Sequence, residues 1–64
     1  MEFKIIYSYI YDNNNKLVSN VYKVNDSYFK FTLNNTIRIF KTFSEVRQYV
    51  NSIPNLKILP FKLF

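Results

Sequence analysis

The chain offers few side chains that could act as acids, bases, nucleophiles or metal ligands. Its 64 residues include no cysteine, no histidine and only four acidic residues. Asp12 and Asp26 fall in Asn-rich stretches that are typical of turns, Glu45 follows Thr42 at the spacing of a helix capping box, and Glu2 is terminal. Without His or Cys, the usual general base, thiolate nucleophile and zinc ligands are missing. We therefore expect a protein that is not an enzyme and holds no metal or cofactor.

The formal net charge of +5 points first to an acidic partner such as nucleic acid. The lysines, however, are spread singly along the chain and form no basic run. The chain also lacks Gly and Ala and is rich in Asn, Lys, Ile, Phe and Tyr, whose codons are AT-rich. An AT-rich genome thus accounts for part of the lysine excess without selection for function.

Three polar segments, at 12–15, 25–26 and 34–35, predict turns between strands. Asn and Asp tolerate the left-handed backbone conformation that tight hairpin turns require, and in a chain without glycine they must supply it. The runs between the turns alternate in polarity, which predicts an antiparallel meander. Within each strand we expect these residues to share a face: Phe3, Ile5, Tyr7, Tyr9 and Tyr11; Val18, Tyr22 and Val24; Phe29, Phe31 and Leu33; Ile37 and Ile39.

The period changes after residue 42, where apolar residues recur at helical spacing. Thr42 with Glu45 marks the start and Pro54 the end, which predicts a helix from about Ser44 to Ser52. The segment 56–59 predicts a fifth strand, which Pro60 would confine to an edge. We therefore expect one small α+β domain over residues 1–64. It has an antiparallel sheet of four to five strands, a β-meander, with one short helix packed on one face.

Three short strands followed by Phe40-Lys41-Thr42-Phe43-Ser44-Glu45-Val46 and a helix resemble the small arm-type DNA-binding domains at the front of phage and transposon integrases. Those domains also have a Ser or Thr before a short acidic helix start. The resemblance covers part of the chain and is one of shape. It implies direct contact with DNA.

Direct DNA or RNA binding is the second of two hypotheses for function. A sheet face with Tyr28, Lys30, Arg38 and Phe40 could stack bases and meet phosphates. Ordinary sheet surfaces carry the same residue types, because aromatics form strands well and cations solvate the outer face.

We favour the other hypothesis, a small binding or inhibitor protein that acts on a larger host protein or nucleoprotein complex. Its size and composition are typical of phages and mobile elements with AT-rich genomes. The surplus of aromatic and aliphatic residues, including Phe61 in the tail, favours an interface. The alternative is that the tail completes the core. The expected contacts with a partner or nucleic acid are Tyr28, Lys30, Arg38, Arg47 and Phe61.

Location and oligomeric state follow from absent signals and from the small core. No apolar stretch approaches the roughly 20 residues of a membrane helix, and no secretory signal is visible. We therefore expect a cytoplasmic protein that contacts no membrane, in the host cell cytoplasm if the source is viral. Pairing of edge strands in a homodimer would compensate for the small core and is compatible with either hypothesis.

Overall fold

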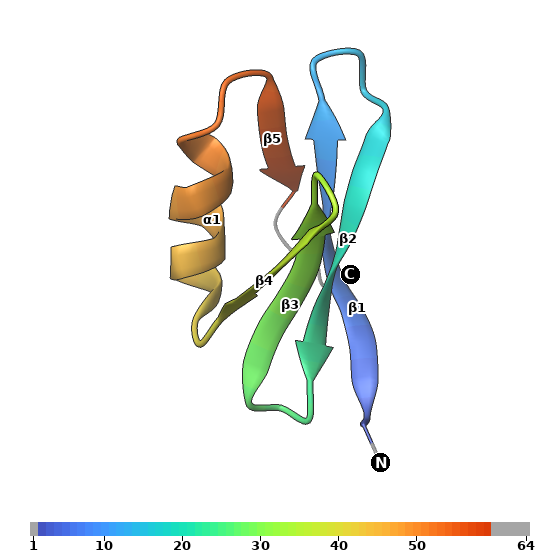
Figure 1. Cartoon of the computed structure of the whole chain (residues 1–64), viewed down its shortest axis with the longest axis vertical. Helices are drawn as coiled ribbons and strands as arrows, with labels where there is room; N and C mark the ends of the chain where they lie inside the picture. The colour runs from blue at the N-terminus through green and yellow to red at the C-terminus, as the bar shows by residue number, and fades with distance from the viewer. Residues whose placement is uncertain (1, 60–64) are drawn as a thin grey trace.

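The computed structural model describes residues 2–59 as an α+β fold (Figure 1). Five strands and one helix follow in the order β1 (Lys4–Asp12), β2 (Leu17–Val24), β3 (Tyr28–Leu33), β4 (Thr36–Phe40), α1 (Phe43–Asn51) and β5 (Leu56–Leu59). This confirms the predicted fold class. The predicted fifth strand is present, and the helix begins one residue before its expected start.

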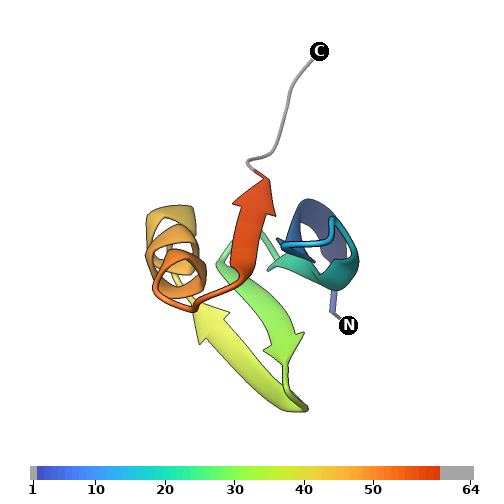
Figure 2. The same ribbon diagram turned by 90° about the horizontal axis from the view of Figure 1, so that it is seen from above.

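The strands form one antiparallel sheet in the order β4-β3-β2-β1-β5. The first four strands are a meander, and β5 returns from the helix to pair with β1 on its other side. Viewed from above, the sheet curls, and α1 lies against its inner side near both edge strands, β4 and β5 (Figure 2). One face of the sheet is therefore covered by the helix and the other is not.

The turns use Asn and Asp where most proteins use glycine. Within residues 2–59, every residue with positive φ is of one of these two types: Asn15, Asn25, Asp26, Asn34, Asn35 and Asn55. Asn34 and Asn35 both adopt positive φ between the paired residues Leu33 and Thr36, as a two-residue mirror-image hairpin turn requires. This confirms that Asn and Asp supply the left-handed conformation.

The helix begins at the predicted capping box. The Glu45 amide donates to the Thr42 hydroxyl oxygen at 3.3 Å, and the Thr42 amide donates to the Glu45 carboxylate at 3.2 Å. These two bonds satisfy amides that have no partner within the helix. Val46 and Val50 on the inner side of α1 are fully buried.

The core lies between α1 and the inner face of the sheet. Its buried members are Ile10, Val21, Phe29, Phe31, Leu33, Val46 and Val50. Aromatic rings fill the space around them: Tyr7 lies edge-on to both Phe29 and Phe43, with centroids 4.9 and 5.0 Å away. Such contacts add to the stability that area burial alone provides.

A β-bulge at Tyr7 overturns the face predicted for β1. The pairing with β2 shifts between Ile6 and Ser8, so Tyr7 is an extra residue in the strand. Consequently Tyr7 packs on the core and Ser8 is buried beside it, while Tyr9 is exposed on the other side. The expectation that every second residue from Phe3 to Tyr11 shares one face is wrong, because the regular alternation of side chains is interrupted at a bulge.

The face predicted for β2 is also partly wrong. A second irregularity in the pairing leaves Val18 between the Ile10–Ser19 and Tyr11–Leu17 pairs. Val18 is exposed, whereas Tyr22 and Val24 stay together on the face opposite Val21. The core member of β2 is therefore Val21.

Replacing Asn34 tests the turn directly. Its φ of 51° costs any residue with a Cβ atom, and glycine removes that cost. We expect Asn34→Gly to raise the free energy of unfolding, or leave it unchanged, and Asn34→Ala to lower it by about 1 kcal/mol. Denaturant unfolding of the two variants measures both effects, and an alanine variant as stable as the glycine variant would contradict this geometry.

Candidate functional site

The sheet face away from α1, here called the open face, is defined by the pairing of the strands. Residues directly opposite each other on paired strands point to the same side. One row crosses four strands through Ile39, Lys30, Tyr22 and Ile6. A second row on this side contains Tyr28, Val24 and Lys4, and a third contains Ile37 and Thr32. On β1, Tyr9 also belongs to the open face.

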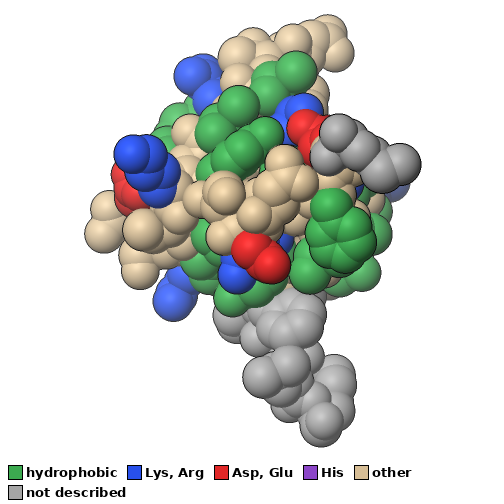
Figure 3. Space-filling view, turned by 90° about the horizontal axis from the view of Figure 1, so that it is seen from below, with side chains coloured by type: hydrophobic (Ala, Val, Ile, Leu, Met, Phe, Trp, Pro, Cys, Tyr) green, Lys and Arg blue, Asp and Glu red, His purple; other side chains and the backbone are tan. Residues whose placement is uncertain are grey.

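Large apolar side chains are exposed on the open face. Ile39 and Ile37 on β4 retain 56% and 58% of their accessible surface, and Ile6 on β1 retains 43%. Seen from below, hydrophobic side chains also lie at the surface among charged ones (Figure 3). A scattered exposed Ile needs no explanation, but several on one face mark an interaction surface.

Two lysines on this face are held close to other side chains. The Lys4 ammonium lies 4.8 Å from the centroid of the Tyr22 ring, a cation–π distance. The Lys30 ammonium lies 3.8 Å from a carboxylate oxygen of Glu2. Both members of the ion pair are partly exposed, so the pair contributes at most about 1 kcal/mol.

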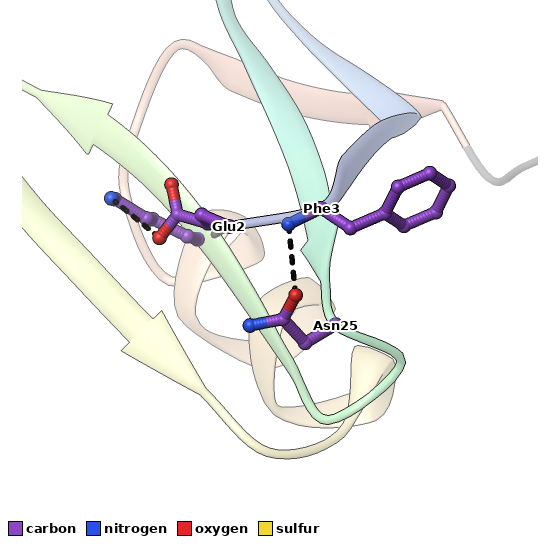
Figure 4. A network of polar contacts seen from close by, with 4 residues as sticks. Glu2, Phe3 and Asn25 are labelled. Carbon is purple, nitrogen blue, oxygen red and sulfur yellow. Dashed lines mark hydrogen bonds and ion pairs between the residues drawn. The ribbon is translucent and has the colours of Figure 1, made fainter.

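Two hydrogen bonds between Phe3 and Asn25 fix the backbone next to Glu2 at the start of β1; Figure 4 shows the one from the Phe3 amide, together with the ion pair of Glu2. The Phe3 backbone amide donates to the Asn25 side-chain oxygen at 2.8 Å, and the Asn25 backbone amide donates to the Phe3 carbonyl at 2.6 Å. These bonds extend the β1–β2 pairing beyond Lys4. They hold the carboxylate of Glu2 beside Lys30, where it lowers the positive charge of the open face.

Val24 gives the open face a buried anchor of its own. It is completely buried, yet it is not part of the core cluster under α1. Its neighbours across the strands are Lys4 on β1 and the half-buried Tyr28 on β3. The open face therefore has some packing of its own and is more than a solvated layer.

The open face also holds a buried oxygen without a hydrogen bond within the described residues, Asn20 Oδ1. The other side-chain atom of Asn20, Nδ2, donates to the Tyr22 hydroxyl at 3.4 Å. The site lies where β2 and β3 diverge, because their pairing stops after Tyr22–Lys30. A buried acceptor without a donor costs free energy, and nothing in the sequence indicated it.

The structure separates the residues expected to form one binding site. Tyr28 and Lys30 lie together on the open face. Arg38 pairs with Phe31 and lies on the helix side, with its guanidinium 5.3 Å from the Tyr49 ring centroid. The predicted face that joined Arg38 and Phe40 to Tyr28 and Lys30 is therefore wrong.

The remaining two candidates lie elsewhere. Arg47 is exposed, as predicted, on the outer side of α1, where it helps to line a shallow hollow of about 230 Å³ with Ser44, Gln48 and Asn51. Phe61 lies outside the described residues, so its predicted role stays a prediction. The tail begins as part of the core, because Leu56 and Ile58 of β5 pack against it.

Ile37 and Ile39 are the open-face residues that sequence reasoning misplaced. They were expected to share a face, which is confirmed, but that face is the one without the helix. The signal was present in the two-residue turn at Asn34-Asn35. A turn of this length pairs Leu33 with Thr36 and thereby places the two isoleucines on the other face of the sheet from the core residues of β3.

Comparison with known proteins gives no relative from which a function could be carried over. No family model matches the chain, and neither a curated protein nor a solved structure matches it significantly. Within residues 2–59, no three acidic side chains gather as a metal site would require, and no helix is long and apolar enough to cross a membrane.

Shortening Val24 tests whether the open face has its own packing. We expect Val24→Ala to lower the free energy of unfolding by roughly 2 kcal/mol, because it leaves a gap at a completely buried position. Val18→Ala, at an exposed position of the same strand, should change it by less than about 0.5 kcal/mol. Equal effects in chemical denaturation would contradict the burial of Val24.

Proposed function

We propose that this chain is a small non-enzymatic binding protein whose open face docks on a larger protein or nucleoprotein complex. The observation that carries the proposal is the row Ile39–Lys30–Tyr22–Ile6, which spans four strands and ends in exposed isoleucine at both sides. Tyrosine is enriched in protein interfaces, and the part of an interface that becomes fully buried is more apolar than the rest of the surface.

The small size of the chain supports the same proposal. A single nine-residue helix covers the inner face of five strands, and the described residues place no second layer on the outer face. Burial of Ile37, Ile39 and Ile6 against a partner would stabilise the complex by removing apolar surface from water. A binding protein gains affinity from the surface that a self-sufficient domain would bury.

The biological setting is part of the proposal. The glycine-free, Asn- and Lys-rich composition is that of an AT-rich genome, and proteins of this size from phages and mobile elements often block a larger host assembly. An inhibitor needs only a stable surface and no catalytic group, which agrees with a chain without His or Cys.

Direct nucleic-acid binding is the second candidate. Tyr22 and Tyr28 lie on the open face with Lys4 and Lys30, so aromatic rings and cations do occur together. Two contacts weaken this candidate: Glu2 offsets the charge of Lys30, and Lys4 already lies over the Tyr22 ring. Arg38 lies on the opposite face and cannot join them.

Titration with labelled single- and double-stranded DNA and RNA separates the two candidates. We expect weak binding at low salt that disappears at physiological salt, because spread lysines give only the nonspecific electrostatic contribution. Binding that persists at physiological salt and is lost in Tyr28→Ala would favour the nucleic-acid candidate and contradict the proposal.

Substitution of adjacent isoleucines tests the open face against a protein target. Ile6 and Ile5 retain 43% and 46% of their surface but point to opposite faces of β1. In affinity capture from a lysate of the source organism, we expect Ile5→Asn to retain the captured proteins and Ile6→Asn to lose at least one of them, because a buried amide without a partner weakens an interface.

Ile5→Asn serves as the control for any effect of Ile6→Asn on folding. Both replace the same residue type at nearly the same exposure, so their effects on folding should be similar, and circular dichroism and thermal unfolding verify this. Equal capture by the two folded variants would show that the open face is not the docking surface.

A further inference from the structure

The outer edge of β4 is an unpaired strand edge in the described part of the sheet. β4 is the last strand on its side, and no described residue pairs with its outer edge. All its residues except Phe40 are exposed. A long exposed apolar edge is a site where another strand can add to a sheet.

The turn fixes which backbone groups this edge offers. A two-residue turn closes on a hydrogen-bonded pair, here Leu33 and Thr36, and such pairs alternate with non-bonded pairs along the ladder. Arg38 and Phe40 therefore bond toward β3. The amide and carbonyl groups of Ile37 and Ile39 point outward, where they could form hydrogen bonds with an added strand.

The side chains of β4 define what the added strand should carry. Ile37 and Ile39 project to the open face, and Arg38 projects to the helix side. Lys41 follows the strand, and no acidic residue occurs between Asp26 and Glu45. Neither Arg38 nor Lys41 has an ion pair within residues 2–59. The edge is therefore apolar on one side and cationic on the other.

A second copy of the chain fits this edge poorly. Antiparallel pairing of two β4 strands that uses the outward groups of both isoleucines places Ile37 against Ile39 and Arg38 against its own copy. The two arginines would form a non-hydrogen-bonded pair, in which the Cα atoms of the facing residues are about 4.5 Å apart. Like charges directly opposite each other destabilise a pair of strands.

We propose that β4 accepts an extended acidic segment of a partner protein as an additional strand. In that segment, apolar residues face Ile37 and Ile39, and a Glu or Asp on the opposite side faces Arg38. The proposal rests on the proposed function and names the chemistry of the partner. Backbone bonds supply affinity, while the alternation of apolar and acidic residues supplies specificity.

Two capped peptides of about nine residues test this proposal. One alternates valine with glutamate, and the other alternates valine with lysine. With isotope-labelled protein, NMR should show amide shifts centred on β4 and slower hydrogen exchange at Ile37 and Ile39 for the glutamate peptide. The glutamate peptide should bind at least about fivefold more tightly than the lysine peptide, since one opposes a cation with an anion and the other with a cation.

Two changes check the contacts separately. Arg38→Glu should reverse the preference between the peptides, whereas Arg47→Glu, which makes the same change in net charge on α1, should leave it unchanged. A glutamate peptide that is N-methylated at the amides facing β4 should lose binding, because its donors to the edge are blocked.

Absent binding of both peptides, equal binding of the two, or unchanged binding after N-methylation would each overturn the proposal. If the protein forms a dimer through β4 and the peptide dissociates that dimer, a second copy does fit the edge. This result would overturn the choice of an acidic strand as the partner. None of these outcomes decides the role of the open face, which the comparison of Ile6→Asn with Ile5→Asn tests independently on β1.

Discussion

The β-bulge at Tyr7 is the constraint on which the arrangement of this sheet depends. Because the bulge adds one residue to β1, Tyr7 and Ser8 both turn to the core, and Ile10 follows them into it. The same shift sends Ile6 to the other side, where it completes the row with Tyr22. A straight strand could not place Tyr7 against Phe29 and Ile10 under the helix on the same face.

From this constraint follows an imbalance between the two sides of the sheet. The inner side holds a dense aromatic core under α1, in which the Tyr7 ring meets the rings of Phe29 and Phe43 edge to face. The outer side holds exposed isoleucines, tyrosines and lysines, with Val24 as its buried anchor. The Asn and Asp residues of the turns close the hairpins but add no second layer among the described residues. Binding of a partner at the open face or the β4 edge would remedy the imbalance, and the cation at Arg38 makes an acidic partner more favourable than a second copy.

Much of the fold could be predicted from local chemistry. The turns were visible as Asn and Asp clusters, and the helix start as Thr42 with Glu45, because these signals depend only on neighbours in sequence. Which face each strand presents was predicted less well, since a bulge depends on packing across strands and leaves no mark in the polarity of β1. Of the candidate contacts, Tyr28 and Lys30 lie on one face as predicted, whereas Arg38 was assigned to the wrong face although the two-residue turn before β4 fixes its side.

We infer that the β4 edge and the open face beside it are free in the folded protein. Residue-resolved hydrogen exchange of β4 amides in dilute solution tests it most directly. We expect alternation along the strand: the Ile37 and Ile39 amides exchange near their intrinsic rates, and the Arg38 and Phe40 amides, which bond to β3, are protected. Strong protection at all four positions would mean that the outer edge is already occupied, and it would contradict the account.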